Sequence, residues 1–188
     1  MTGPSRILIV PGWRNSEPAH WQSLWEARLP GAHRVAQGDW MFPRRQDWVD
    51  RLADAILCVP DERVVVVAHS LGCITTAHLP PDAAARVSAA LLVAPADPER
   101  RAQLADFAPV PYQRLPYRST VVASSNDPYC PVRLAGAYAR AWGSEFVRLE
   151  NAGHINVAAG FGEWPLGLQL LSQLGVGVDA ADLLRRAA

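Results

Sequence analysis

Six short apolar segments, separated by stretches with helical periodicity, limit the fold of this chain more than any other feature of its sequence. They lie at residues 6–10, 32–37, 63–68, 89–94, 119–124 and 145–149. Between most of them apolar residues recur every three or four positions, as Trp48, Leu52 and Ile56 do. Strands that alternate with helices are typical of βαβ units, which build a mostly parallel sheet with helices on both faces. The sequence therefore predicts an α/β fold with about six mostly parallel strands.

Some of the helical stretches also carry start signals. Ser16 is a suitable N-cap for the first helix, with Pro18 in the first turn and Trp21 and Trp25 on one apolar face. Residues 165–174 predict a C-terminal helix.

The length and composition favour a single domain. The chain has 188 residues, 49% of them hydrophobic, and a chain of this size buries about 70% of its unfolded surface in one core. No change in composition marks a boundary, so we expect one domain over residues 1–188, with 176–188 as a loosely packed tail. Residues 97–116 contain four prolines and predict an irregular excursion rather than a helix. The sequence leaves open whether this excursion covers a site.

The balance of charge gives no reason to expect nucleic acid or an anionic membrane as a partner. The chain has 18 basic and 18 acidic residues and a formal net charge of zero. All the basic residues are arginine, which excludes a lysine nucleophile. The first apolar run is too short for a signal peptide or a membrane span, so we expect no membrane partner.

The three cysteines, Cys58, Cys73 and Cys130, form no CxxC motif and no metal-binding spacing with histidine. This usage favours a reduced, cytoplasmic setting. Because the sequence also contains no P-loop and no GxGxxG motif, we expect neither a metal nor a cofactor.

A polar turn follows the most apolar segment. Four valines end at Ala68-His69-Ser70-Leu71-Gly72, which resembles a nucleophile elbow, a sharp strand-to-helix turn that exposes a serine. Such a turn needs small residues two positions before and after the serine, and Ala68 and Gly72 meet this need. The alternative is that Ser70 only caps the next helix, since serine is favoured there.

A serine nucleophile requires a base and an acid, and both occur in the expected order. Asp127 follows the fifth predicted strand and His154 the sixth, so both lie at the same sheet edge as Ser70. Asp97, after the fourth strand, is an alternative acid, and Asp127 has an alternative role as a turn residue that caps a helix. We predict Ser70, Asp127 and His154 as catalytic residues. The remaining histidines, His20, His33, His69 and His78, are expected to be structural, although His20 is close enough to the first loop to help shape the site.

The loop after the first strand supplies further candidates. In a sheet with strand order 2-1-3-4-5-6, ligands bind between strands 1 and 3, where the strand order reverses. The loop with Gly12 and Trp13 would then face the serine. We expect the backbone N–H groups of Leu71 and Trp13 to form an oxyanion hole. The candidate substrate-binding residues are Gly12, Trp13, Trp40 and His69.

Together, Pro11-Gly12-Trp13 and residues 69–72, 125–129 and 153–156 resemble the small α/β-hydrolases of the retinoblastoma-binding protein 9 / YdeN type. The resemblance covers nearly the whole chain and fades after about Gly175. It implies a minimal α/β-hydrolase without a substantial cap, with Ser70, Asp127 and His154 as the triad. The Leu-x-Cys-x-Glu element that binds the retinoblastoma protein is missing, because Leu71-Gly72-Cys73 is not followed by x-Glu, and that partner is not expected.

The resemblance and the residues predict a serine hydrolase that cleaves small carboxylic esters, or activated amides, through an acyl-enzyme. One alternative is a binding or regulatory module on a hydrolase fold. Another is an acyltransferase or perhydrolase that uses the same triad. The physiological substrate and the oligomeric state are not readable from the sequence.

Overall fold

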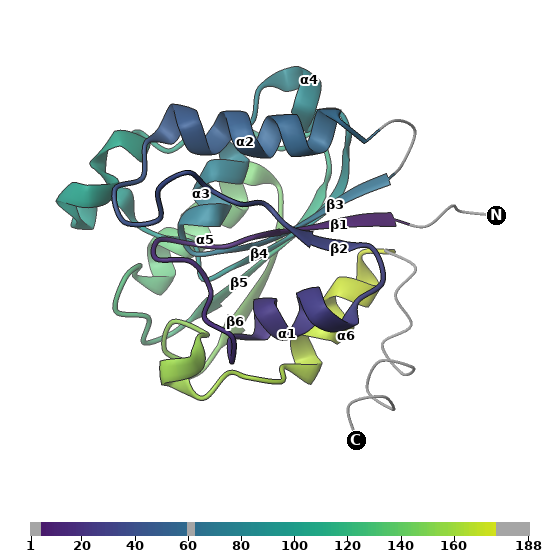
Figure 1. Ribbon diagram of the computed structural model, residues 1–188. Helices are drawn as coiled ribbons and strands as arrows, with labels where there is room; N and C mark the ends of the chain where they lie inside the picture. Colours follow the sequence, from purple (N-terminus) through teal and green to yellow (C-terminus); the bar gives the residue numbers. More distant parts are fainter. Residues whose placement is uncertain (1–4, 60–62, 176–188) are drawn as a thin grey trace.

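The computed structural model describes residues 5–59 and 63–175, and in them six parallel strands form one sheet (Figure 1). The strand order is β2-β1-β3-β4-β5-β6, and every neighbouring pair is parallel. The predicted α/β fold is therefore confirmed. The expectation of a loose tail at residues 176–188 lies outside the described residues. The strands are β1 (Ser5–Val10), β2 (Ala32–Arg34), β3 (Arg63–His69), β4 (Val87–Val93), β5 (Arg118–Ser124) and β6 (Glu145–Leu149).

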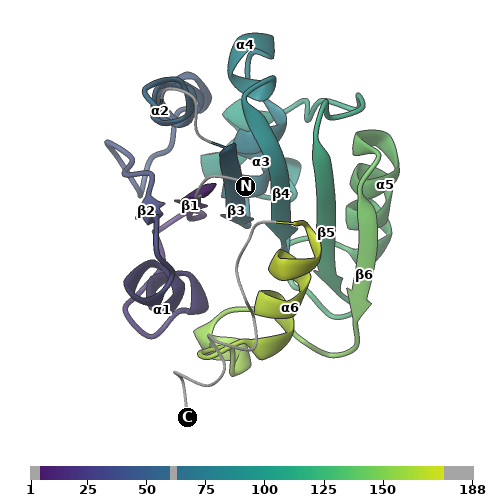
Figure 2. The same ribbon diagram turned by 90° about the vertical axis from the view of Figure 1, so that its right-hand side faces the viewer.

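Helices cover both faces of the sheet (Figures 1 and 2). Helices α1 and α6 pack on one face, while α2, α3 and α5 pack on the other. This is the arrangement expected for right-handed βαβ connections in a parallel sheet. The helices are α1 (Trp21–Arg28), α2 (Arg45–Leu57), α3 (Leu71–Ala77), α4 (Pro81–Ala84), α5 (Val132–Trp142) and α6 (Pro165–Gln173).

The valine run forms the central strand β3, which is buried on both faces. Val64 and Val66 pack toward α2 and α3, whereas Val65 and Val67 pack toward α1 and α6. All four are at most 1% exposed, and burial of one valine side chain contributes about 2 kcal/mol. A strand held this firmly fixes the point at which the chain leaves the sheet at Ser70.

Two predicted boundaries are wrong. Helix α1 begins at Trp21 rather than near Ser16, because the Ser16 hydroxyl donates to Gln22 Oε1 at 2.7 Å and caps no helix. His20 is the N-cap instead, and its Nδ1 accepts from the Gln22 N–H. Strand β2 ends at Arg34 and is shorter than the predicted 32–37, because it lies at the sheet edge and has one neighbouring strand.

The proline-rich segment 97–116 contains no α-helix, as predicted. It forms the 3₁₀ helices η1 (Pro98–Arg100) and η2 (Ala102–Phe107). Leu104 and Phe107 are buried, and Phe107 contacts the Trp48 ring with centroids 5.9 Å apart. The segment is therefore fastened to the core beneath α2.

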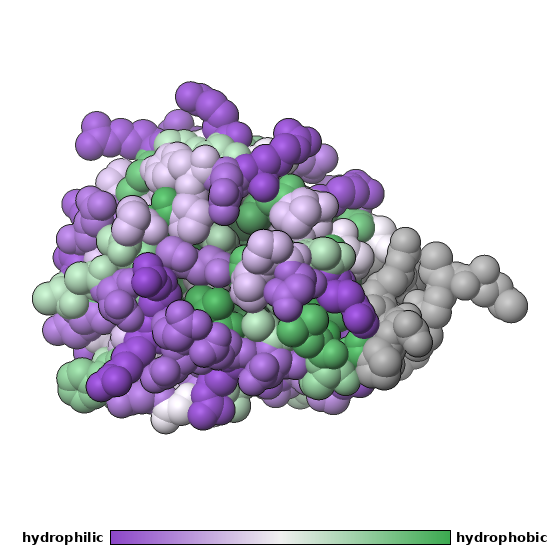
Figure 3. Space-filling model, turned by 90° about the horizontal axis from the view of Figure 1, so that it is seen from above, coloured by the Kyte–Doolittle hydropathy of each residue, from purple (hydrophilic) through white to green (hydrophobic). Residues whose placement is uncertain are grey.

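Hydrophilic side chains cover most of the molecular face that lies above the sheet in Figure 1, and hydrophobic ones form small patches between them (Figure 3). Helices that bury one side against the sheet are expected to present such a polar outer side. Every helix in the described ranges is too short or too polar to cross a membrane.

Candidate active site

Ser70 occupies a strained turn between β3 and α3. Its φ is 55° and its ψ is −119°, a backbone conformation that costs an L-residue about 1–3 kcal/mol. Hydrogen bonds from the Ser70 N–H to the Val93 carbonyl and from the Ala96 N–H to the Ser70 carbonyl hold it in place. Ser70 stands at the N-cap position of α3, yet its side chain makes no capping hydrogen bond. The alternative that it serves only as a helix cap is therefore wrong.

Two glycines let the elbow and the first loop approach closely. A Cβ atom at Gly72 would lie 2.3 Å from the Val10 carbonyl oxygen, and one at Gly12 would lie 2.7 Å from Ser70 Cβ. Real Cβ atoms do not come so close to other heavy atoms. These residues therefore have to be glycine if the loop after β1 is to lie directly against Ser70.

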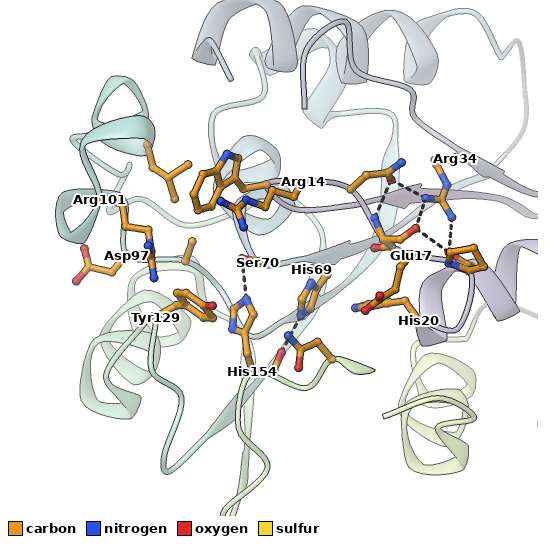
Figure 4. A pocket seen from close by; sticks show the side chains of 18 residues that line it. Arg14, Glu17, His20, Arg34, His69, Ser70, Asp97, Arg101, Tyr129 and His154 are labelled. Carbon is orange, nitrogen blue, oxygen red and sulfur yellow. Dashed lines mark hydrogen bonds between the residues drawn. The ribbon is translucent and has the colours of Figure 1, made fainter. Parts of the chain in front are cut away.

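A chain of hydrogen bonds runs from Ser70 through His154 to Asp127, and Figure 4 shows its first step, from Ser70 to His154. Ser70 Oγ lies 2.9 Å from His154 Nε2, and His154 Nδ1 lies 2.8 Å from Asp127 Oδ2. The carboxylate can only accept, so Nδ1 carries the proton and Nε2 is left with a lone pair for the serine hydroxyl. The Asp127 side chain is 3% exposed, so little water competes for the imidazole N–H.

The alternative acid, Asp97, accepts from the Glu99 N–H at the start of η1. Asp127 accepts from His154 and also from the Tyr129 N–H, two residues further on. Asp127 is thus a turn residue as well, but it is not the cap of α5, whose N-cap is Pro131. The structure brings Asp127, and not Asp97, to His154.

Side chains at the end of β5 fasten the loop of Asp127 to the loop of His154. Ser124 Oγ accepts from the Ala152 N–H at 2.9 Å, and Asn126 Oδ1 accepts from the Gly153 N–H at 2.8 Å. The sequence analysis assigned no role to Ser124 or to Asn126, although Asn126 belongs to the 125–129 motif. The available signal was the Ser-Ser-Asn run directly before Asp127.

Two further histidines pack beside His154. The ring of His69 lies between those of His20 and His154, with centroids 4.8 Å from each. The His69 Nε2–H donates to the backbone carbonyl of His154 at 2.9 Å. Burial lowers the pKa of His69 well below its usual value, and burial together with the nearby His154 lowers the pKa of His20 to about 4. Both rings are therefore uncharged near neutral pH, and His69 supports the loop that carries His154.

A cavity of about 840 Å³ opens beside Ser70. Trp13 and His69, both predicted substrate-binding residues, line it. Asp97, Arg101 and Leu104 line it as well. The excursion after β4 thus contributes one wall of the cavity, which is the size of a small-molecule site.

The other two predicted substrate-binding residues do not line this cavity. Gly12 lies beneath it, against Ser70. The Trp40 ring packs on Trp48 with centroids 5.5 Å apart, and the Trp40 carbonyl accepts from the Arg14 N–H at 3.0 Å. Trp40 therefore supports the first loop from behind, which corrects the expectation that it forms a wall.

The two predicted oxyanion donors are the backbone N–H groups of Leu71, in the elbow, and of Trp13, in the loop after β1. Leu71 is the first residue of α3, so its N–H has no partner within the helix. The Trp13 indole N–H donates to the Met41 carbonyl at 2.9 Å, which fixes the position of the Trp13 ring in the loop after β1. Within the described parts of the chain, neither backbone N–H donates to another group. Both amides are thus available to a bound oxygen.

No group of three or more histidine, cysteine or acidic side chains in the described residues could hold a metal ion. The arrangement that is present suits acyl transfer, in which serine, imidazole and backbone amides act without one.

A parallel sheet in this order, with a serine on a strained turn between β3 and α3, defines an α/β-hydrolase. A model of the serine hydrolase family matches residues 7–173, and the chain belongs to that family. Within it the chain is of the YdeN type, as the resemblance predicted.

Solved structures support both statements. A YdeN-like hydrolase from Pectobacterium atrosepticum is 33% identical, with 96% of this chain and 92% of that chain covered and a TM-score of 0.82. The ydeN gene product of B. subtilis is 23% identical, with 90% and 98% covered and a TM-score of 0.78. Butyrate-bound esterase 2 of Thermogutta terrifontis shares the fold at 18% identity, with 95% and 85% covered and a TM-score of 0.69. No curated protein matches the chain.

Proposed function

We propose that the protein hydrolyses small carboxylic esters, and activated amides, through an acyl-enzyme on Ser70. The observation that carries the proposal is the hydrogen-bonded chain from Ser70 Oγ through His154 to Asp127. A serine hydroxyl is a weak nucleophile unless a base lies within hydrogen-bond reach and a third group orients that base. Membership of the serine hydrolase family supports the same reaction class.

In the first half-reaction, Ser70 Oγ attacks the acyl carbonyl while His154 Nε2 takes the hydroxyl proton. Asp127 holds the imidazole in the required tautomer and stabilises the imidazolium. The carbonyl oxygen becomes an oxyanion that accepts from the N–H groups of Leu71 and Trp13, and loss of one such donor costs about 3 kcal/mol of barrier. His154 then gives its proton to the leaving oxygen, the bond from carbonyl carbon to that oxygen breaks, and the acyl group stays on Ser70.

In the second half-reaction, water takes the place of the alcohol. His154 Nε2 accepts a proton from the water as its oxygen attacks the acyl-enzyme, and the same two amides hold the new oxyanion. The bond to Ser70 Oγ breaks, the serine regains the proton from His154, and the carboxylic acid leaves. The net reaction is ester plus water to acid plus alcohol.

A fluorophosphonate probe tests the nucleophile directly. The native protein should become labelled and should hydrolyse p-nitrophenyl butyrate, a short ester chosen because an esterase of this fold binds butyrate. Ser70→Ala should abolish labelling and turnover, whereas Ser172→Ala, on α6 and away from the cavity, should keep both. Undiminished labelling of Ser70→Ala would end the proposal.

A further inference from the structure

Two arginine side chains lie over the aromatic ring that borders Ser70. The Arg14 guanidinium carbon is 4.4 Å from the Trp13 ring centroid, and that of Arg101 is 5.7 Å from it. Arg101 also lies 4.7 Å from the Tyr129 ring, which in turn contacts His154 at 4.5 Å. All five of these residues line the same cavity. A guanidinium stacked on a ring keeps its N–H edge free for an anion.

Neither arginine is neutralised by a carboxylate. Among the ion pairs of the described residues, none includes Arg14 or Arg101. Arg34, the third arginine of the cavity, is by contrast bonded to Glu26 at 2.8 Å and to Asn15 at 2.6 Å. Two like charges over one ring repel each other, and an anion placed between them would relieve that repulsion.

The backbone conformation at Arg14 also supports a role for this side chain in binding an anion. Arg14 has a φ of 70° and Asn15 a φ of 66°, a region in which glycine is at ease and other residues are strained. The Arg14 N–H donates to the Trp40 carbonyl and the Asn15 N–H to the Gly12 carbonyl, both at 3.0 Å, and so hold this turn. A long cationic side chain is thus kept at a strained position from which it reaches the cavity, and such strain is typical of ligand clamps.

The acidic residues that line the cavity, Glu17 and Asp97, form no ion pair with Arg14 or Arg101 among the described residues. Asp97 Oδ1 accepts from the Glu99 N–H in its own turn. Glu17 lies with Arg34 on the other side of Ser70 from Arg101 (Figure 4). The neighbouring rings of His20 and His69 are uncharged near neutral pH, because burial lowers the pKa of each.

From this geometry we infer that the preferred substrates are esters that carry a carboxylate near the scissile bond, bound by Arg14 and Arg101. The inference rests on the proposed ester hydrolysis at Ser70 and adds the substrate class. Arginine is suited to this role, because its planar N–H groups pair with both oxygens of a carboxylate. The carboxylate can belong to the acyl part or to the alcohol part, and both present the same chemistry to the two guanidinium groups.

Matched pairs of chromogenic esters test the inference and separate these two sources. The first pair is the p-nitrophenyl monoester of adipic acid and its methyl ester, which has the same acyl chain without the charge. The second pair is a butyrate ester of a nitrophenol that bears a carboxylate on the ring, and the methyl ester of that carboxylate. For each pair the measured quantity is the ratio of kcat/KM for the charged ester to kcat/KM for the neutral one.

We expect the ratio to exceed one by about tenfold or more in one of the pairs, mainly through a lower KM, as one charge-assisted hydrogen bond supplies. Arg14→Gln and Arg101→Gln should each lower that ratio about tenfold. Arg140→Gln, an exposed arginine in the last turn of α5, should leave it unchanged. Added salt should also lower the ratio in the native protein.

A ratio at or below one in both pairs, or a ratio that neither arginine substitution lowers, would overturn the inference while Ser70-dependent hydrolysis of the neutral esters still stood. Loss of the proposed function looks different. In that case the neutral esters would either not be hydrolysed or be hydrolysed equally well by Ser70→Ala.

Discussion

At the scale of single residues, two carboxylates near the cavity differ in what they accept. Asp127 accepts the Nδ1–H of His154, whereas Asp97 accepts a backbone N–H of its own 3₁₀ turn. A carboxylate that fixes the imidazole tautomer controls whether Nε2 can take the serine proton. One that only closes a turn has no such control.

Asp127→Asn is therefore expected to lower kcat by about four orders of magnitude, because the amide favours the wrong imidazole tautomer. The measurement is turnover of a neutral p-nitrophenyl ester, with thermal unfolding to show that the variant is folded. Asp97→Asn is the matched control and should retain most of the activity. If Asp97→Asn were the crippling change, the hydrogen-bonded chain described above would not be the catalytic one.

Ser70, Asp127 and His154 could be predicted because each follows a strand and their order along the chain is that of the hydrolase fold. Ser124 and Asn126 could not, since their partners are backbone amides of residues 152 and 153, which only the folded sheet brings near. The position of Arg14 and Arg101 beside the cavity could not be predicted either. It depends on the positive φ of Arg14 and on the course of the excursion that carries Arg101.

At the scale of elements, Ser124 and its neighbour Ser125 give a matched test of how β5 joins the site. The buried Ser124 hydroxyl accepts the N–H of Ala152, and the Ser125 hydroxyl accepts the N–H of Asn151 in a more exposed setting. Ser124→Ala leaves a buried amide without an acceptor, which should cost about 1–3 kcal/mol of unfolding free energy. Ser125→Ala should cost less, because water can replace the hydroxyl. Urea unfolding measures both, and equal losses would contradict the assigned difference in burial.

The turn from β3 to α3 makes a second prediction at this scale. Gly72→Ala places a Cβ against the Val10 carbonyl and should lower the unfolding free energy by at least about 3 kcal/mol. Gly136→Ala in α5 is the control, because its Cβ would meet only Phe146 ring atoms at 3.7 Å or more. There the loss of glycine flexibility should raise stability by about 0.5–1 kcal/mol. A Gly72→Ala protein as stable as the native one would show that the elbow and the first loop do not touch so closely.

At the scale of the whole molecule, the two-sided burial of the strands made the sheet predictable, whereas the cavity was not. Apolar runs without alternation indicate strands covered on both faces, and the helical stretches between them supply the cover. The start of α1 was missed because the N-cap is His20, a residue with no strong preference for that position. The cavity wall from residues 97–116 could not be predicted. Prolines indicate that a segment is not a regular helix or strand, but they do not determine its path across the molecule.

Burial of His20 and His69 makes the unfolding free energy of the whole protein depend on pH. The pKa of His20 falls from its usual 6.5 to about 4 in the folded state, through burial first and the neighbouring His154 second. Between these two values the unfolded chain binds more protons than the folded one, so the unfolding free energy decreases as pH falls below about 6.5. For His20 the loss is about 2 kcal/mol between pH 7 and pH 5. The pKa of His69 is lowered as well, and its contribution has the same sign.

Urea unfolding at pH 7 and at pH 5 measures this loss, and His20→Asn assigns it. Asparagine can still accept the Gln22 N–H at the N-cap of α1 but does not titrate, so the variant should lose about 2 kcal/mol less than the native protein between the two pH values. His33→Asn, at an exposed position on β2, is the matched control and should keep the native dependence. Equal pH dependence in the native protein and in His20→Asn would contradict the burial of an uncharged imidazole at this position. A dependence that persists in His20→Asn but disappears when His69 is also replaced would assign the remainder to His69, the ring that supports the His154 loop.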